Sequence, residues 1–251
     1  MMLLGVMATL GTAHGAPLPL TTTLYSENFD TLASSGTSST TPAGWEFLES
    51  TGNTTYTAGT GSGTSGDTYS FGAAATTERA FGELTTGSFN TLIGVGIENQ
   101  TGSTIESLLL SYTGEQWRLG AVGRMDLLNF QYSTDATSLN TGTWTDFNSL
   151  DFIAPMTSGA TGALDGNDSA NRSALSDTLS GLSVAPGGTI WFRWADFDAS
   201  SSDDGLAIDD FALRVLSDSQ PVPEPGTWGL ASGGFLGLVA LLHKRKSRKH
   251  A

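Results

Sequence analysis

Short stretches that alternate between hydrophobic and polar positions mark the middle of the chain as β-structure. At residues 189–194, Ile190, Phe192 and Trp194 fall on one face of an extended strand, and Arg193 falls on the other. Clusters of Ser, Thr and Gly separate such segments, and no helical period runs long enough to predict a helix bundle. The pattern predicts an all-β sandwich. Further strands are predicted at residues 92–98, 105–112, 126–132 and 143–147.

The amino-terminal residues have a different character. Residues 1–10 are apolar, and small residues at Ala13 and Gly15 precede Ala16, which suits cleavage by a signal peptidase. We therefore predict a signal peptide over residues 1–15. No Lys or Arg precedes the apolar run, however, so a buried amino-terminal strand or helix remains the alternative.

The carboxy-terminal residues fall into three zones. A proline-rich stretch at 221–226 precedes an apolar run at 228–242, and a tail at 243–251 carries five cations. The run predicts a short transmembrane helix with its basic end in the cytoplasm. Fifteen residues at a rise of about 1.5 Å cover about 22 Å, less than the hydrocarbon core of about 30 Å. So short a span suits a segment that stays in the membrane only briefly. The alternative is an ordinary permanent transmembrane anchor.

These three zones resemble the PEP-CTERM sorting signal of exopolysaccharide-producing Gram-negative bacteria. Pro223, Glu224 and Pro225 form the sorting motif of that resemblance, followed by a glycine-interrupted span and a basic terminus. The resemblance implies an exosortase-type sorting enzyme as partner and a transient stay in the inner membrane. It also implies export to the cell surface or the extracellular matrix. The domain organisation is then a signal peptide, a body at residues 16–220 and a sorting segment at 221–251.

The composition of the body excludes several classes of function. Residues 16–220 contain no Cys, His or Lys, and their six arginines face 24 acids, a formal charge of −18. Such a charge repels phosphates, which excludes nucleic-acid binding. Ser-His-Asp and Cys-His nucleophiles, imidazole or thiolate zinc sites and Schiff-base lysines are unavailable. Carboxylate chemistry remains, either as a glycosidase-like pair of acids or as a calcium site.

Two passages of the body resemble jelly-roll domains of the MAM and choice-of-anchor kind. The first contains the run 27–30, Glu-Asn-Phe-Asp, and then 42–45, Pro-Ala-Gly-Trp; the second is the acidic run at 203–211. The resemblance implies a jelly-roll β-sandwich in which the acidic opening strand lies near the closing strand. The cysteine pairs typical of MAM domains are missing here.

The closing strand contains a change of parity. Leu206 and Ile208 share one face, whereas the hydrophobic positions after residue 210 share the other, so a β-bulge is predicted at Asp209-Asp210. The resemblance places Glu27 alongside. Glu27, Asp209 and Asp210 are therefore our predicted metal site, with calcium as the ion that clustered carboxylates favour. The alternative is that these acids are solvated at strand ends or pair with arginine.

A second group of acids, Asp196, Asp198, Asp203 and Asp204, has the spacing of a calcium loop without matching an EF-hand, and a plain solvated loop is its alternative.

The remaining candidates for binding are aromatic. Trp117 and Arg118 combine a ring with a planar cation and are predicted to contact a sugar, with Trp144 and Trp191 as a second platform. The alternatives are burial in the core, because tryptophans of a sandwich are most often packed inside it, and a pairing of Arg118 with an acid on a neighbouring strand.

The leading functional interpretation is an exported, non-catalytic protein of the cell surface or exopolysaccharide matrix. Calcium is its expected cofactor and extracellular polysaccharide its expected ligand. The alternative is a secreted hydrolase, such as a glycosidase, that works with carboxylates alone.

Overall fold

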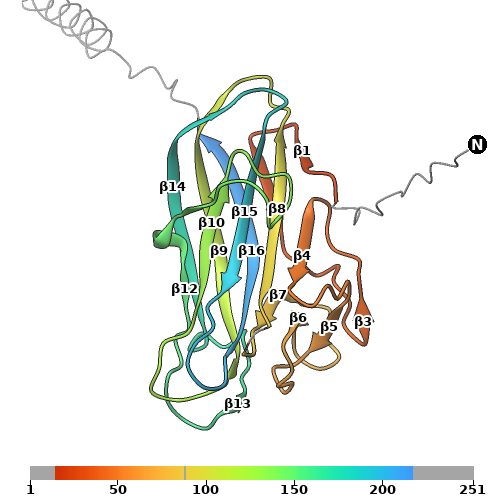
Figure 1. Cartoon of the computed structure of the whole chain (residues 1–251), viewed down its shortest axis with the longest axis vertical. Helices are drawn as coiled ribbons and strands as arrows, with labels where there is room; N and C mark the ends of the chain where they lie inside the picture. Colours follow the sequence, from red (N-terminus) through yellow and green to blue (C-terminus); the bar gives the residue numbers. More distant parts are fainter. Residues whose placement is uncertain (1–14, 88, 217–251) are drawn as a thin grey trace, which may run out of the picture. The chain divides into compact units, whose positions relative to one another are not determined.

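The computed structural model describes residues 15–87 and 89–216, and two packed β-sheets account for these residues (Figure 1). The first sheet contains β1 (Leu18–Leu20), β4 (Trp45–Glu49), β8 (Thr91–Asn99), β10 (Leu127–Ser133), β11 (Thr145–Asp146), β12 (Phe152–Ile153) and β15 (Thr189–Asp196). The second contains β2 (Leu24–Glu27), β3 (Thr37–Ser38), β5 (Tyr56–Gly59), β6 (Asp67–Phe71), β7 (Ala80–Leu84), β9 (Ile105–Leu119), β13 (Gly162–Ala163), β14 (Arg172–Val184) and β16 (Gly205–Leu216). A short 3-10 helix, η1, spans Asn148–Leu150.

This architecture confirms the predicted all-β sandwich. The predicted signal peptide at 1–15 and the predicted transmembrane helix at 228–242 lie outside the described residues, apart from Gly15. Among the residues that are described, no helix has the length and apolar character needed to cross a membrane.

The central strands of each sheet pair antiparallel and bring distant parts of the sequence together. In the first sheet, β15 lies between β8 and β10. In the second, β9 pairs with both β14 and β16, and β16 also pairs with β7 and with β2 near the start of the chain. The predicted closeness of the opening and closing strands is thus observed, because β2 and β16 are direct neighbours.

The main core lies between the two sheets and confirms the alternation seen at residues 189–194. Ile190, Phe192 and Trp194 belong to it, whereas Trp191 on the opposite face packs with Ala136 and Leu139. The Trp45 ring stacks on Trp194 with 5.8 Å between ring centroids. Aromatic burial of this kind dominates the energetics of a core that has no disulfide to support it.

The β-bulge predicted in the closing strand is present. The pairing of β16 with β9 shifts register between Asp209 and Ala212, and Asp210 has a φ of +49°. Ile208 before the bulge and Phe211 after it both face the main core. The extra residue therefore keeps both hydrophobic segments inside and gives Asp209 and Asp210 different surroundings.

A second, smaller hydrophobic cluster covers the outer face of the second sheet. It includes Phe71, Ala80, Trp117 and Ala207. These residues alternate along their strands with residues of the main core, such as Phe81 beside Ala80 and Ile208 beside Ala207. The second sheet is thus buried on both faces near this cluster.

Candidate functional site

Trp117 lies in the second hydrophobic cluster and not on an open surface. Its side chain is 1% exposed, and its ring is nearly parallel to that of Phe71, with an interplanar angle of 4° and centroids 6.1 Å apart. Gly166 packs so closely over the indole that an added Cβ would lie 2.3 Å from Nε1. The prediction that Trp117 offers a platform to a sugar is therefore wrong, because the packing of this face covers the ring.

The other residues predicted to contact a sugar differ in how far they are buried. Arg118 is half-buried and donates from Nη1 to the carbonyl of Gly61 at 3.2 Å. Trp191 is buried, whereas Trp144 is half-buried and carries the Arg193 guanidinium 4.0 Å from its ring centroid. Trp144 is thus the member of the predicted second platform that solvent can still reach.

Three carboxylates meet beside Trp117, and we call them the acid cluster: Glu78, Glu115 and Asp209. Glu78 precedes β7, Glu115 lies on β9 and Asp209 sits at the bulge of β16. One oxygen of each lies within 4.8 Å of the others. Glu115 is fully buried, and Asp209 is 8% exposed.

Neighbouring groups fix part of this acid cluster. Trp117 Nε1 donates to Glu115 Oε2 at 2.9 Å, and the Asn167 amide donates to Glu78 Oε2. Burial is the main reason that the pKa of Glu115 is raised to about 7 and that of Asp209 to about 8. The arrangement suits a bound proton or a bound cation.

The structure groups the predicted metal ligands differently from the sequence. Glu27 on β2 lies opposite Phe211 in register, and its carboxylate accepts the Phe29 N–H at 3.0 Å. Glu27 and Asp210 line one hollow of about 420 Å³. Asp209 instead joins the acid cluster, because the bulge gives adjacent carboxylates different surroundings.

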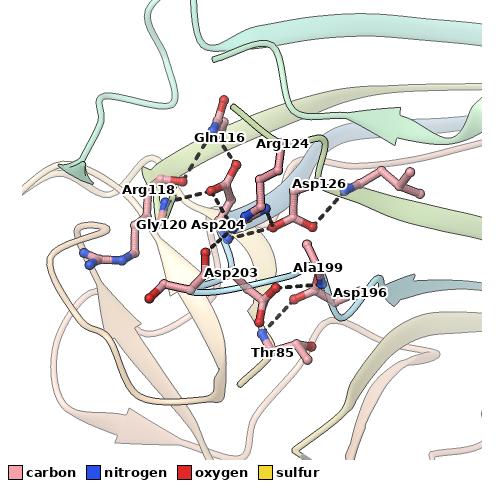
Figure 2. A network of polar contacts seen from close by, with 12 residues as sticks. Thr85, Gln116, Arg118, Gly120, Arg124, Asp126, Asp196, Ala199, Asp203 and Asp204 are labelled. Carbon is pink, nitrogen blue, oxygen red and sulfur yellow. Dashed lines mark hydrogen bonds and ion pairs between the residues drawn. The ribbon is translucent and has the colours of Figure 1, made fainter. Parts of the chain in front are cut away.

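The second predicted group of acids is largely buried, so the alternative of a plain solvated loop does not hold for most of them. Asp203 and Asp204 are each 2% exposed and Asp196 is 8% exposed, whereas Asp198 is exposed. Figure 2 shows how Asp203 and Asp204 lie beside Arg124 and Asp126, and we call these four residues the loop network. Sequence reasoning missed Arg124 and Asp126, because no local pattern places them against a loop that follows about 80 residues later.

Arg124 neutralises part of the loop network. Its guanidinium lies 2.8 Å from Asp126 Oδ2 and 3.3 Å from Asp204 Oδ1 (Figure 2). Asp126 Oδ2 also accepts the Asp204 N–H, and the Asp204 carboxylate accepts the N–H of Gly120 and the amide of Gln116.

Acids outnumber the cation here. Burial raises the pKa of Asp203 and of Asp204 to about 6. The Asp203 carboxylate accepts the Ala199 N–H at 2.8 Å, and Asp196 accepts the Thr85 N–H at 2.7 Å. These two bonds satisfy backbone N–H groups of the loops. The bond from the Gly120 N–H to Asp204 ties the end of β9 to the segment before β16, so the loop network has a structural role.

Comparison with known proteins assigns the carboxy-terminal segment. Residues 221–246 match the model of the PEP-CTERM protein-sorting motif. This match includes Pro223, Glu224 and Pro225, which lie outside the described residues. A search of the curated proteins found no match to this chain.

Solved structures resemble the chain only in general architecture. One is TmCBM61 in complex with β-1,4-galactotriose, with 11% identity over 68% of this chain and 88% of that chain and a TM-score of 0.35. Another is the K2 cleaved adhesin domain of Lys-gingipain, with 14% identity over 77% of this chain and 98% of that chain and a TM-score of 0.44. A third is the family 11 carbohydrate-binding module of Clostridium thermocellum in complex with a β-1,3-1,4-mixed-linked tetrasaccharide. It has 12% identity over 68% of this chain and 88% of that chain, and a TM-score of 0.33.

These likenesses are too distant to transfer any site residue. The described residues and the family match together establish two features. The chain has an all-β two-sheet sandwich, and it carries a PEP-CTERM protein-sorting motif at residues 221–246.

Proposed function

We propose that the protein is an exported, non-catalytic component of the cell surface or of an exopolysaccharide matrix. The match of residues 221–246 to the PEP-CTERM motif carries this proposal. An exosortase-type enzyme recognises the motif while the apolar run holds the chain briefly in the inner membrane. The sandwich, which we propose to be of the jelly-roll type, is then displayed outside the cell.

A non-catalytic role is supported by the surroundings of the buried acids. Glu83 and Glu115 are both fully buried, and the ring of Trp117 lies against Glu115. A polymer substrate has no access to such carboxylates, although the chemistry of a carboxylate-only hydrolase requires contact between acid and glycosidic oxygen. No His, Cys or Lys stands in residues 16–220 to supply another mechanism.

Polysaccharide binding is the finer part of the proposal. Its support is Trp144, a half-buried ring with the Arg193 guanidinium 4.0 Å above it, since a ring and a planar cation suit a sugar face and its hydroxyls. Trp144→Ala should weaken retention of the protein on exopolysaccharide from its own host. Unchanged retention would remove this part and leave the sorting proposal intact.

The sorting proposal is tested by following the chain in a host that contains the sorting enzyme. Mass spectrometry and cell fractionation of the wild type should find the protein at the surface or in the medium without residues 228–251. The variant Glu224→Gln, combined with Pro223→Ala and Pro225→Ala, should remain in the inner membrane with its tail. Pro221→Ala, in the same segment, is the matched control and should behave as wild type. Equal sorting of the triple variant would refute the proposal.

A further inference from the structure

We propose that the acid cluster of Glu78, Glu115 and Asp209 binds a hard divalent cation of the calcium class. The three side chains come from β9, from the bulge of β16 and from the loop before β7, yet one oxygen of each lies within 4.8 Å of the others. A single ion at 2.3–2.6 Å from each oxygen fits that spacing, since two of its ligands are then at most about 5 Å apart.

Unsatisfied oxygens are the independent observation that points to a ligand. Glu115 is fully buried, and its Oε1 has no hydrogen-bond donor within the described part of the chain. The same holds for the buried Glu78 Oε1 among those residues. A buried acceptor without a partner costs about 1–3 kcal/mol, and more when it is charged, so native proteins rarely leave one.

Hydrogen-bond donors hold the other oxygen of each glutamate and thereby fix the orientation of both carboxylates. Trp117 Nε1 holds Glu115 Oε2, and the Asn167 amide holds Glu78 Oε2. Each glutamate therefore has one oxygen fixed by a donor and a second oxygen that a cation can take. Such outer contacts orient the ligands of metal sites in general.

Charge balance favours a cation over the protein's own groups. Arg172 on β14 lies opposite Glu115 in register and is exposed. Within residues 15–87 and 89–216, no ion pair closer than 4.0 Å joins an arginine to any member of the acid cluster. Three adjacent carboxylates repel one another unless protons or a cation intervene.

The type of ligand selects the ion. All ligands are oxygens, because residues 16–220 contain neither His nor Cys, and this disfavours zinc and copper. Three carboxylates that can bind through one or both oxygens suit the 6–8 ligands and flexible geometry of Ca²⁺. Mg²⁺ requires a near-ideal octahedron and retains its water more strongly.

The bulge of β16 explains why the sequence alone suggested a different set. With Asp210 at a φ of +49°, Asp209 is directed to Glu78 and Glu115, and Asp210 lines a hollow with Glu27. The proposal therefore replaces Glu27 and Asp210 by Glu78 and Glu115 as partners of Asp209.

Calorimetric titration of the full chain tests the proposal. The protein, kept in mild detergent and freed of metal by chelator, is titrated with CaCl2 and separately with MgCl2. We expect saturable Ca²⁺ binding in the range of extracellular modules, about 0.1–1 mM, and weaker Mg²⁺ binding. At a Ca²⁺ concentration about 100 times Kd, the melting temperature should rise by about 5–10 °C.

Variants assign the site. Asp209→Asn and Glu115→Gln should each weaken Ca²⁺ binding at least about tenfold, as expected when a charged ligand becomes neutral. Glu78→Gln should weaken Ca²⁺ binding in the same way, and because Glu78 is only half-buried, this change disturbs folding less. Glu106→Gln, exposed on the same strand β9, is the matched control and should bind as wild type.

Two outcomes would overturn the proposal. One is the lack of any Ca²⁺ binding or melting shift up to about 10 mM, well above the affinity of extracellular calcium modules, which would mean that protons alone neutralise the acid cluster. The other is binding that Glu27→Gln abolishes while Glu78→Gln leaves it unchanged, which would place the ion in the hollow beside Asp210. Neither outcome bears on sorting through the PEP-CTERM motif.

Discussion

Glu83 offers the sharpest test of the electrostatics inside the sandwich. It lies on β7 two residues after Phe81, so strand alternation directs it toward the main core, and it is fully buried. Burial is the main cause that raises its pKa from 4.5 to about 8, and the charge of Glu49 adds to it. The perturbation we choose is Glu83→Gln, which keeps the size of the side chain and removes the ionisation.

The sign of the effect follows from the raised pKa in the folded state. Below pH 4.5 the carboxyl is protonated in both the folded and the unfolded chain, so Glu83 carries no penalty. As the pH rises from 4.5 toward 8, the unfolded chain releases this proton while the folded chain keeps it, and the free energy of unfolding falls. The loss is about 1.4 kcal/mol per pH unit, or about 3 kcal/mol at pH 7 and about 5 kcal/mol above pH 8.

Urea unfolding with chelator present measures this effect. Glu83→Gln should match the wild type near pH 4.5 and be more stable by about 3 kcal/mol at pH 7. Glu106→Gln, the same change at an exposed position, should show no such pH-dependent gain. A variant that is destabilised equally at both pH values would refute the reasoning, since Glu83 would then contribute through packing or hydrogen bonds and not through its charge.

Three further predictions concern packing, charge pairing and the bulge, each measured by urea unfolding at pH 7. Trp194→Ala removes a fully buried ring from the main core and should cost about 3–5 kcal/mol, whereas Trp144→Ala, at a half-buried position, should cost clearly less. Arg124→Ala leaves two buried carboxylates without their cation and should cost about 3 kcal/mol, against little change for the exposed Arg214→Ala; equal effects would contradict a structural loop network. Asp210→Val should be about 1–2 kcal/mol less stable than Asp210→Gly, because only glycine adopts a positive φ without cost, and equal stabilities would argue against the bulge.

Much of the fold was predictable because its signals are local. The alternation of Ile190, Phe192 and Trp194 and the parity change at Asp209-Asp210 both follow from the two-residue period of a strand, and both are confirmed. The lengths of the strands were less predictable. β9 continues to Leu119, well past the predicted end at residue 112, because β14 and β16 pair with it on its two sides even where its sequence is less regular.

The candidate site was predictable only in part, because it depends on which strands meet. Asp209 was identified, yet its partners Glu78 and Glu115 lie far away in the sequence, and no periodicity brings them to it. Trp117 was misinterpreted for a related reason. Phe71 and the turn at Gly166 bury its ring, and the residues that flank Trp117 in the sequence do not indicate either contact.

The lysine-free sandwich has a practical consequence for following the fate of this protein. The side-chain amines of the chain are confined to Lys244, Lys246 and Lys249. In residues 16–220 all the cationic side chains are arginines, which carry guanidinium groups. An amine-reactive dye therefore labels the precursor in its basic tail, and a product that has lost this tail retains just the α-amino group. The fall in dye incorporated per molecule reports maturation in a gel lane, without an antibody or a fused tag.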